Sequence, residues 1–297
     1  MKWPVPENLP VLRQIRIENT NACGYKCTFC PREKMDRPVG IQSVEDFVFV
    51  MDRVEEYLGK KYSGGVHLHG YGEPLLDKKL PEKIKLCHAR WPKIKTTIIT
   101  TLGYNLSREY IQELVDSGLC KLVVSFYGSD PETYKAHTTV DRFDIAFNNL
   151  KLLLELAALR DKPMEIKVQA HIFGLKSTAD QKNKENFLKQ IKELKVPISY
   201  IRLHNYGDGR NYLKSKKLLC ERAIGRRFLQ VTWDLNVKPC GLDYNAQEKF
   251  GNLRTMTLKE IFMSEKAKQF LSDHCNENAD VYSICKNCTM RCLSKIG

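Results

Sequence analysis

Short apolar runs and longer amphipathic segments alternate along most of the chain. The short runs are rich in β-branched residues and are bounded by glycine or polar residues, which predicts β-strands. The expected strands cover residues 11–18, 66–69, 95–101, 121–126, 165–173 and 199–204. Between them, apolar residues at three-and-four spacing predict helices, for example over 44–58, with Ser43 as N-cap, and over 143–158.

This alternation predicts right-handed crossovers and a parallel sheet. Six such units would form an α/β fold, a partial (β/α)6 TIM-like barrel, with ligands at the C-terminal ends of the strands. After residue 204 the pattern changes to a hairpin over 227–240 and a helix over 257–271. Six of the eleven cysteines lie in this tail. We therefore expect a barrel core over 1–204 and a small metal-binding domain over 205–297.

Composition narrows the class of protein. Of the 297 residues, 42% are apolar and 28% are charged, which excludes global disorder. No apolar run approaches the roughly 18 residues of a membrane helix, and no secretory signal opens the chain. We therefore expect a cytoplasmic protein without membrane contacts, in which clustered cysteines bind metal rather than form disulfides.

The chain carries a formal charge of +13, and its densest basic stretch covers 210–227. Such a stretch can bind an acidic protein, a phosphorylated substrate or nucleic acid, or can simply be a solvated surface.

Three cysteines follow the first expected strand at C-x3-C-x2-C spacing: Cys23, Cys27 and Cys30. Three thiolates can hold three irons of a [4Fe–4S] cluster and leave the fourth iron open to a ligand. The alternative is a zinc site, although zinc prefers four protein ligands in structural sites. With this triad the sequence resembles the radical S-adenosylmethionine (radical SAM) superfamily.

A second segment supports the resemblance. Residues 70–74, Gly-Tyr-Gly-Glu-Pro, are similar to the superfamily's GGEP motif, with Tyr71 in place of the first glycine. The resemblance implies that Gly72, Glu73 and Pro74 bind the amino group of SAM. It also implies an adenine contact for Phe29, a polar SAM contact for Ser125, and a ribose or substrate contact for Asn205, with ordinary packing or a turn as the alternative at each.

The resemblance implies the following chemistry. SAM chelates the open iron, one electron breaks its bond from sulfur to the 5′-carbon, and the 5′-deoxyadenosyl radical removes a hydrogen atom from an unactivated C–H bond. The protein must then aim this radical and exclude competing reactions.

The tail resembles the SPASM and twitch extensions of radical SAM enzymes, and its six cysteines favour the single-cluster twitch form. The expected ligands of an auxiliary [4Fe–4S] cluster are Cys220, Cys240, Cys285 and Cys288, with structural zinc as the alternative. Cys275 and Cys292 are left over. Cys87 and Cys120 are expected to be buried small hydrophobic residues.

An auxiliary cluster accepts an electron, which favours two-electron dehydrogenation of a small polar substrate such as a sugar or aminocyclitol. Glu18 would face the barrel mouth and accept the substrate proton or hold a hydroxyl, unless it is surface-exposed or salt-bridged. Epimerisation is an alternative, with Cys275 or Cys292 as the hydrogen donor. Peptide modification is another, although the roughly ten residues before the first strand count against a leader-binding domain.

The expected electron donor is a flavodoxin or ferredoxin, an acidic protein that would dock on Lys214, Lys216 and Lys217. An interpretation from a different class is a non-catalytic zinc protein that binds nucleic acid through the basic stretch. It predicts zinc at both cysteine sites and no SAM binding, and we do not favour it.

Overall fold

The computed structural model describes residues 9–170, 178–200, 220 and 228–288. In this part of the chain a nine-stranded sheet runs in the order β6-β5-β4-β3-β2-β1-β7-β8-β9. Strands β1 to β7 pair in parallel, whereas β8 and β9 are antiparallel additions. The first six strands are β1 (Gln14–Ile17), β2 (Gly65–His67), β3 (Lys95–Thr100), β4 (Lys121–Phe126), β5 (Glu165–Ala170) and β6 (Ile198–Tyr200).

All six expected barrel strands form, and β4 has the predicted bounds. Strand β1 is shorter than predicted because it begins only at Gln14; Val11 is 77% exposed and has no core to pack against. The predicted C-terminal ends of the fifth and sixth strands, like the predicted boundary at 204/205, lie outside the described residues.

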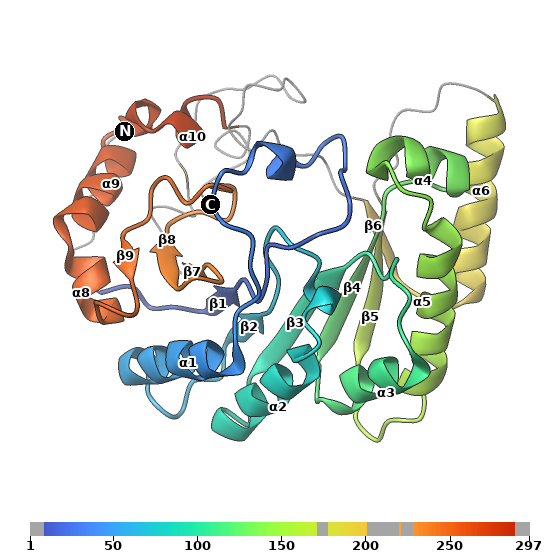
Figure 1. The fold of residues 1–297 in the computed structure, drawn as a ribbon, viewed down its shortest axis with the longest axis horizontal. Helices are drawn as coiled ribbons and strands as arrows, with labels where there is room; N and C mark the ends of the chain where they lie inside the picture. Colours follow the sequence, from blue (N-terminus) through green and yellow to red (C-terminus); the bar gives the residue numbers. More distant parts are fainter. Residues whose placement is uncertain (1–8, 171–177, 201–219, 221–227, 289–297) are drawn as a thin grey trace.

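Helices cover one side of this sheet, and the loops that carry the cysteine triad cross its other side (Figure 1). The helices of the barrel part are α1 (Val44–Leu58), α2 (Leu80–Arg90), α3 (Arg108–Asp116), α4 (Pro131–Thr138), α5 (Phe143–Ala157) and α6 (Thr178–Glu193). Short 3-10 turns follow the two motif segments, at η1 (Pro31–Lys34) and η2 (Pro74–Leu76). No helix in the described ranges is long and apolar enough to cross a bilayer.

Helix α1 shows how the sequence pattern sets the packing. Ser43 caps it as predicted, because the side chain accepts a hydrogen bond from the backbone N–H of Asp46. Phe47, Met51 and Val54 repeat at three-and-four spacing and are fully buried against the sheet.

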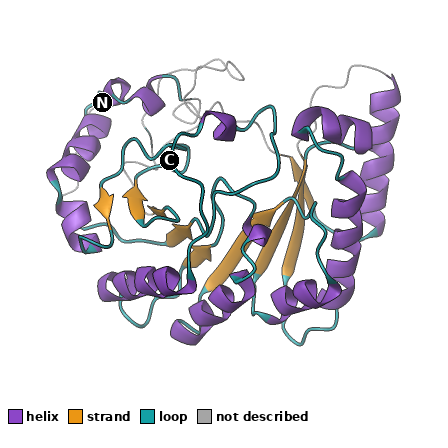
Figure 2. Ribbon diagram, in the orientation of Figure 1, coloured by secondary structure: helices purple, strands orange, loops and turns teal. Residues whose placement is uncertain are grey.

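The predicted tail hairpin is present as β7 (Phe228–Val231) and β8 (Asn236–Lys238), followed by β9 (Gly251–Asn252). Strand β7 pairs with β1, with Phe228 opposite Gln14, so the tail continues the barrel sheet. Figure 2 shows these tail strands beside helices α8 (Leu258–Met263) and α9 (Glu265–Cys275), with η3 (Ala279–Val281) and α10 (Ser283–Lys286) following.

The prediction of one helix over 257–271 is wrong. Ser264 has extended backbone angles, and its side chain accepts a hydrogen bond from the backbone N–H of Ala267. A serine side chain competes in this way with helical backbone bonding, so it ends α8 and begins α9.

The N-cap of α1 offers a test of this local analysis. Replacing Ser43 by Ala removes the acceptor for the Asp46 N–H and should lower the free energy of unfolding by about 1 kcal/mol. The control is Ser63→Ala in an exposed loop, which should change it by less than about 0.5 kcal/mol. Anaerobic chemical denaturation measures both, and equal values for the two variants would contradict the capping role.

Candidate active site

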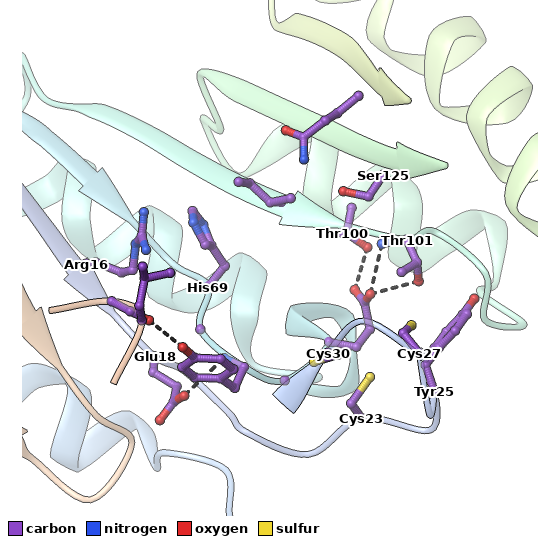
Figure 3. Close-up of a pocket in the computed structure, with 18 of the residues that line it drawn as sticks. Arg16, Glu18, Cys23, Tyr25, Cys27, Cys30, His69, Thr100, Thr101 and Ser125 are labelled. Atoms are coloured by element: carbon purple, nitrogen blue, oxygen red, sulfur yellow. Dashed lines mark hydrogen bonds between the residues drawn. The ribbon is translucent and has the colours of Figure 1, made fainter. Parts of the chain in front are cut away.

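A cavity of about 350 Å³ lies at the C-terminal ends of the parallel strands. The three cysteines of the triad and the segment Gly70–Glu73 line one part of it (Figure 3). The remaining wall receives side chains from successive strands: Arg16 from β1, Gln169 from β5, Gln230 from β7 and Lys238 from β8. The cavity therefore lies where parallel α/β folds bind their ligands.

The cysteine loop is fixed by backbone bonds to helix α4. Thr28 N–H donates to the carbonyl of His137 over 2.9 Å, and Lys26 N–H donates to that of Thr138 over 3.3 Å. On its other side, Gly24 N–H donates to Tyr104 Oη over 2.7 Å. The loop is therefore held in place by protein contacts on both sides.

The three thiols of the triad lie close enough to affect one another. Burial raises the pKa of Cys23 to about 11, and Cys30 adds to the rise. Burial also raises the pKa of Cys27, and both Cys30 and Cys23 contribute. Three partly buried cysteines that line one cavity suit a positively charged iron cluster, which replaces the thiol protons and stabilises the thiolates.

The Gly-Glu-Pro segment packs directly on the cysteine loop. Glu73 N–H donates to the carbonyl of Ala22 over 2.8 Å. A Cβ atom at Gly72 would lie 2.4 Å from the carbonyl oxygen of Thr20 and 2.6 Å from that of Ala22, so the approach requires glycine. The two motifs thus form one unit around the cavity.

The Glu73 carboxylate accepts several hydrogen bonds within the protein, which the sequence did not predict. It is 3% exposed and accepts bonds from Thr100 Oγ1, from the N–H and hydroxyl of Thr101 at 2.9 and 2.8 Å, and from Leu75 N–H at 3.3 Å. Burial raises the pKa of this carboxyl, and these donors oppose the rise. Its contact with the SAM amino group stays a prediction, whereas its bonds to Thr100 and Thr101 fix the motif to the end of β3.

Two polar side chains in the cavity wall each have an atom without a hydrogen-bond partner in the described structure. Ser125 Oγ and His69 Nδ1 are buried and make no hydrogen bond within the described structure. Burial lowers the pKa of His69 well below its usual value, so the imidazole is neutral at pH 7. Phe29 also lines the cavity, with its ring 4.7 Å from that of Tyr127, whereas Asn205 lies outside the described residues. The SAM contacts of Ser125 and Phe29 stay predictions, and the sequence analysis missed His69 although it directly precedes the Gly70–Pro74 segment.

Glu18 lines the cavity, but its carboxylate is already engaged. Both of its oxygens accept bonds of 2.6 Å from the Arg37 guanidinium. They also accept from the backbone N–H of Tyr71 at 3.1 Å and of Trp233 at 3.4 Å. The geometry favours the salt-bridged alternative over a proton acceptor for this residue.

Tyr71, the residue that departs from the superfamily motif, connects the Gly70–Pro74 segment to the tail. Its hydroxyl donates to the carbonyl of Gly241 over 2.6 Å, and its ring packs against Tyr244. Gly241 directly follows Cys240, and Gly241 and Leu242 line the same cavity. The cavity therefore extends from the triad to the loop that carries Cys240.

Cys240 is the tail cysteine that neighbours the other three, although the described residues contain no group of three or more His, Cys, Asp or Glu side chains with the geometry of a metal site. The ligand roles of the four cysteines stay predictions. Burial raises the pKa of Cys240 to about 11, and the neighbouring thiols of Cys220 and Cys288 add to this rise. Cys285 packs in one small apolar cluster with Cys240 and Tyr282. Leu242 N–H donates to Cys240 Sγ over 3.3 Å, a bond that a cluster thiolate can also accept.

The predictions for the remaining cysteines and for the docking lysines have separate outcomes. Cys275 is fully buried on the apolar face of α9 and is not among the cavity-lining residues, so the structure gives no support to its proposed hydrogen-donor role. Cys292 and the predicted docking lysines 214, 216 and 217 lie outside the described residues. Cys87 is buried as predicted, but Cys120 is partly exposed, and a hydrogen bond with His88 lowers its pKa to about 7.

His274 is a further neighbour of the tail cysteines that sequence reasoning missed. Its Nδ1–H donates to the carbonyl of Phe270 over 2.7 Å, and its Nε2 lies 3.5 Å from Cys285 Sγ. Its position one residue before Cys275 was the only signal in the sequence.

Comparison with known proteins defines the class. A model of the radical SAM superfamily matches residues 17–158, and a model of the SPASM iron-sulfur cluster-binding domain matches residues 220–289. The chain therefore belongs to the radical SAM superfamily and carries a C-terminal domain of the SPASM type. Its cofactors are SAM, the [4Fe–4S] cluster that binds SAM, and an auxiliary [4Fe–4S] cluster.

Curated relatives are named GTP 3′,8-cyclase. The protein from Shewanella denitrificans is 31% identical over 227 residues, 75% of this chain and 62% of its own length. The protein from Yersinia pestis is 26% identical over 74% of this chain and 63% of its own length. The chain thus spans less than two thirds of either relative.

Among solved structures, BtrN in complex with AdoMet and 2-DOIA superposes with a TM-score of 0.62 at 19% identity, over 94% of this chain and 93% of that one. Streptococcus suis SuiB bound to the precursor peptide SuiA gives 0.62 at 14% identity, over 96% and 71%. These likenesses confirm the fold, a partial barrel with a small SPASM-type tail.

A stability measurement distinguishes a structural role of Glu18, as the partner of Arg37, from a catalytic role. Glu18→Gln leaves a buried guanidinium without its counter-charge and should lower the free energy of unfolding by about 3–5 kcal/mol, measured by anaerobic chemical denaturation. Glu165→Gln, which breaks an exposed ion pair with Lys121, is the matched control and should cost less than about 1 kcal/mol. If Glu18→Gln kept the stability of the parent protein but lost activity, Glu18 would have to be a catalytic residue.

The assignment of the triad is tested by counting iron. We expect about eight irons per chain in the anaerobically reconstituted protein and about four after Cys23, Cys27 and Cys30 are all replaced by alanine. A parallel zinc determination is needed, because zinc at both sites without iron would contradict both cluster assignments.

Proposed function

We propose that this radical SAM enzyme dehydrogenates a small polar substrate that binds between the two cluster sites. The observation that carries the proposal is the shared cavity. Cys23, Cys27 and Cys30 line it on one side, and Gly241 and Leu242, which follow Cys240, line it on the other. A substrate in this space is within reach of both a radical source and an electron acceptor.

When bound, the cofactors supply the 5′-deoxyadenosyl radical at the triad and a one-electron acceptor at the tail cysteines. The proposed residues for the first cluster are Cys23, Cys27 and Cys30, and those for the second are Cys220, Cys240, Cys285 and Cys288. SAM would be held by the backbone around Gly72, by Ser125 Oγ and by the Phe29 ring.

The polar wall suits a hydroxylated substrate that also carries an anionic or polar group. Gln169 and Gln230 offer amide donors and acceptors, and Arg16 offers a guanidinium. In the balanced reaction, the substrate carbon gives a hydrogen atom to the 5′-carbon, its hydroxyl gives a proton to the protein, and one electron leaves, which forms a carbonyl. His69 Nδ1, which makes no hydrogen bond among the described residues, is our proposed transient recipient of that proton. Burial and Arg16 lower the pKa of His69, so the imidazolium does not persist and the proton passes on to solvent.

The second candidate is a radical reaction on a purine nucleotide, as the name of the relatives indicates. The specific observation in its favour is the 31% identity to a GTP 3′,8-cyclase across three quarters of this chain. Arg16 and Lys238 in the cavity wall would suit a phosphate-bearing ligand. Epimerisation is less well supported, because Cys275 does not reach the cavity lining.

Electron counting distinguishes these reactions. Dehydrogenation returns the electron that SAM cleavage consumed, so we expect one 5′-deoxyadenosine per product with only a priming amount of reductant. An epimerase would use about two reductant electrons per turnover, one to cleave SAM and one to restore the thiol that gave its hydrogen atom. The measurement compares 5′-deoxyadenosine, product and oxidised reductant after anaerobic incubation with SAM and a panel of aminocyclitols, sugars and GTP.

Conversion of GTP to a cyclised nucleotide without net oxidation would overturn the dehydrogenase proposal in favour of the second candidate. The electron donor we propose is an acidic flavodoxin or ferredoxin, in keeping with the +13 charge of the chain.

A further inference from the structure

A second cavity, of about 270 Å³, lies beside the cysteine loop and contains two basic side chains. Lys78 and Arg142 line it together with Asn105, Tyr104 and four residues that are apolar or glycine. None of these lining residues is acidic, and in the described part of the chain none of them also lines the active-site cavity. The second cavity is therefore a separate, positively charged space.

Both cations are oriented by aromatic rings and have no carboxylate partner among the described residues. Lys78 Nζ lies 4.7 Å from the centre of the Tyr110 ring. The Arg142 guanidinium lies 4.5 Å from the ring centre of Tyr104 and 5.2 Å from that of Tyr25, and its Nη1 is buried without a hydrogen bond. Cation–π contacts fix such groups without neutralising them, so both side chains keep N–H donors for an anion.

The N-terminus of helix α5 adds to the positive potential of this cavity. Arg142 is the N-cap residue of the 15-residue helix, no side chain caps the first turn, and Ile145 of that turn lines the cavity. The first N–H groups of a helix lack acceptors within the helix and form the positive end of its dipole. Asp144 in the same turn is exposed and is not a lining residue.

We propose that the second cavity binds a phosphate group through Lys78 and Arg142. A guanidinium offers paired N–H donors that match two phosphate oxygens, and an ammonium adds a point charge. The ligand is either free phosphate or a small phosphate ester, since the cavity has room beyond the phosphate oxygens. The site does not depend on the dehydrogenase proposal, and it is distinct from the active-site wall at Arg16 and Lys238.

A phosphate in this cavity would contact the residues that hold the cysteine loop. Tyr104 Oη accepts from Gly24 N–H over 2.7 Å, and Tyr25 Oη donates to the Gly103 carbonyl over 3.3 Å. The two Nη atoms of Arg142 lie 3.6 and 3.7 Å from the position that a Cβ atom would take at Gly24. Because Gly24 follows Cys23, an anion bound by Arg142 would stabilise the loop that carries the triad.

The test measures binding to the anaerobically reconstituted full chain without SAM or substrate. Isothermal titration calorimetry at constant ionic strength uses inorganic phosphate and ribose 5-phosphate as separate probes. Lys78→Gln removes one charged donor at an exposed position and should weaken binding at least about tenfold. Lys79→Gln is the matched control, because the neighbouring lysine is paired with Glu82 and does not line the cavity, and it should change the affinity less than about twofold.

Amide hydrogen exchange locates the bound probe. We expect either probe to slow exchange in peptides that cover residues 104–105 and 143–145, and Lys78→Gln to remove this effect at the same probe concentration. Binding of both probes would identify the phosphate group itself as the ligand, and binding of ribose 5-phosphate alone would identify an ester.

Three results would overturn the inference. They are no binding of either probe, slowed exchange around Arg16 and Lys238 instead of at the second cavity, and equal weakening by Lys78→Gln and Lys79→Gln. Each of them leaves the dehydrogenase proposal intact, because that reaction uses the other cavity. Lys78 is the position of choice for the test, since Arg142 also contacts the cysteine loop and its replacement would disturb the loop directly.

Discussion

The ion pair between Glu18 and Arg37 joins four segments that are far apart in the sequence. Glu18 directly follows β1, and Arg37 follows the cysteine loop. The two additional donors to the carboxylate are the backbone N–H groups of Tyr71 and Trp233. The side chains of Glu18 and Arg37 are only 6% and 8% exposed, so removal of either partner would leave a buried charge without its counter-charge. The positions of both motifs and of the tail hairpin depend on this one buried charge pair.

Hydrogen bonds between polar groups also organise the wall of the cavity. The Glu73 carboxylate is saturated by β3, and Tyr71 and Lys238 bond to carbonyls of the turn that follows Cys240. These bonds place rigid protein on two sides of a space in which a reactive radical would have to be directed. Ser125 and His69 line the cavity, and Ser125 Oγ and His69 Nδ1 are among the buried polar atoms that make no hydrogen bond within the described residues. Buried polar groups of this kind are expected at functional sites.

The sequence predicted the family, the fold class and the succession of strands along the chain, because each leaves a local pattern of spacing or alternation. The ligand roles of the triad and of the four tail cysteines stay predictions. It could not predict the break at Ser264, where a serine side chain outweighs a continuous helical pattern. It also could not show that Glu18 is paired with Arg37, or that Tyr71 reaches Gly241, 170 positions away. These contacts depend on tertiary proximity, and neither residue type nor spacing encodes them. Lys238 and His274 were missed for the same reason, since a single lysine or histidine in the tail has no motif of its own.

Strand β7 also has a consequence for how the two parts of the molecule can be separated. It pairs along the whole length of β1, whose other side is taken by β2. Without the tail, β1 would present a bare row of backbone N–H and C=O groups, together with the apolar side chains Ile15 and Ile17, at the rim of the sheet. Such an open rim is a template for pairing between chains. The tail thus protects the barrel against self-association, and the two sequence families found in this chain act as one folding unit.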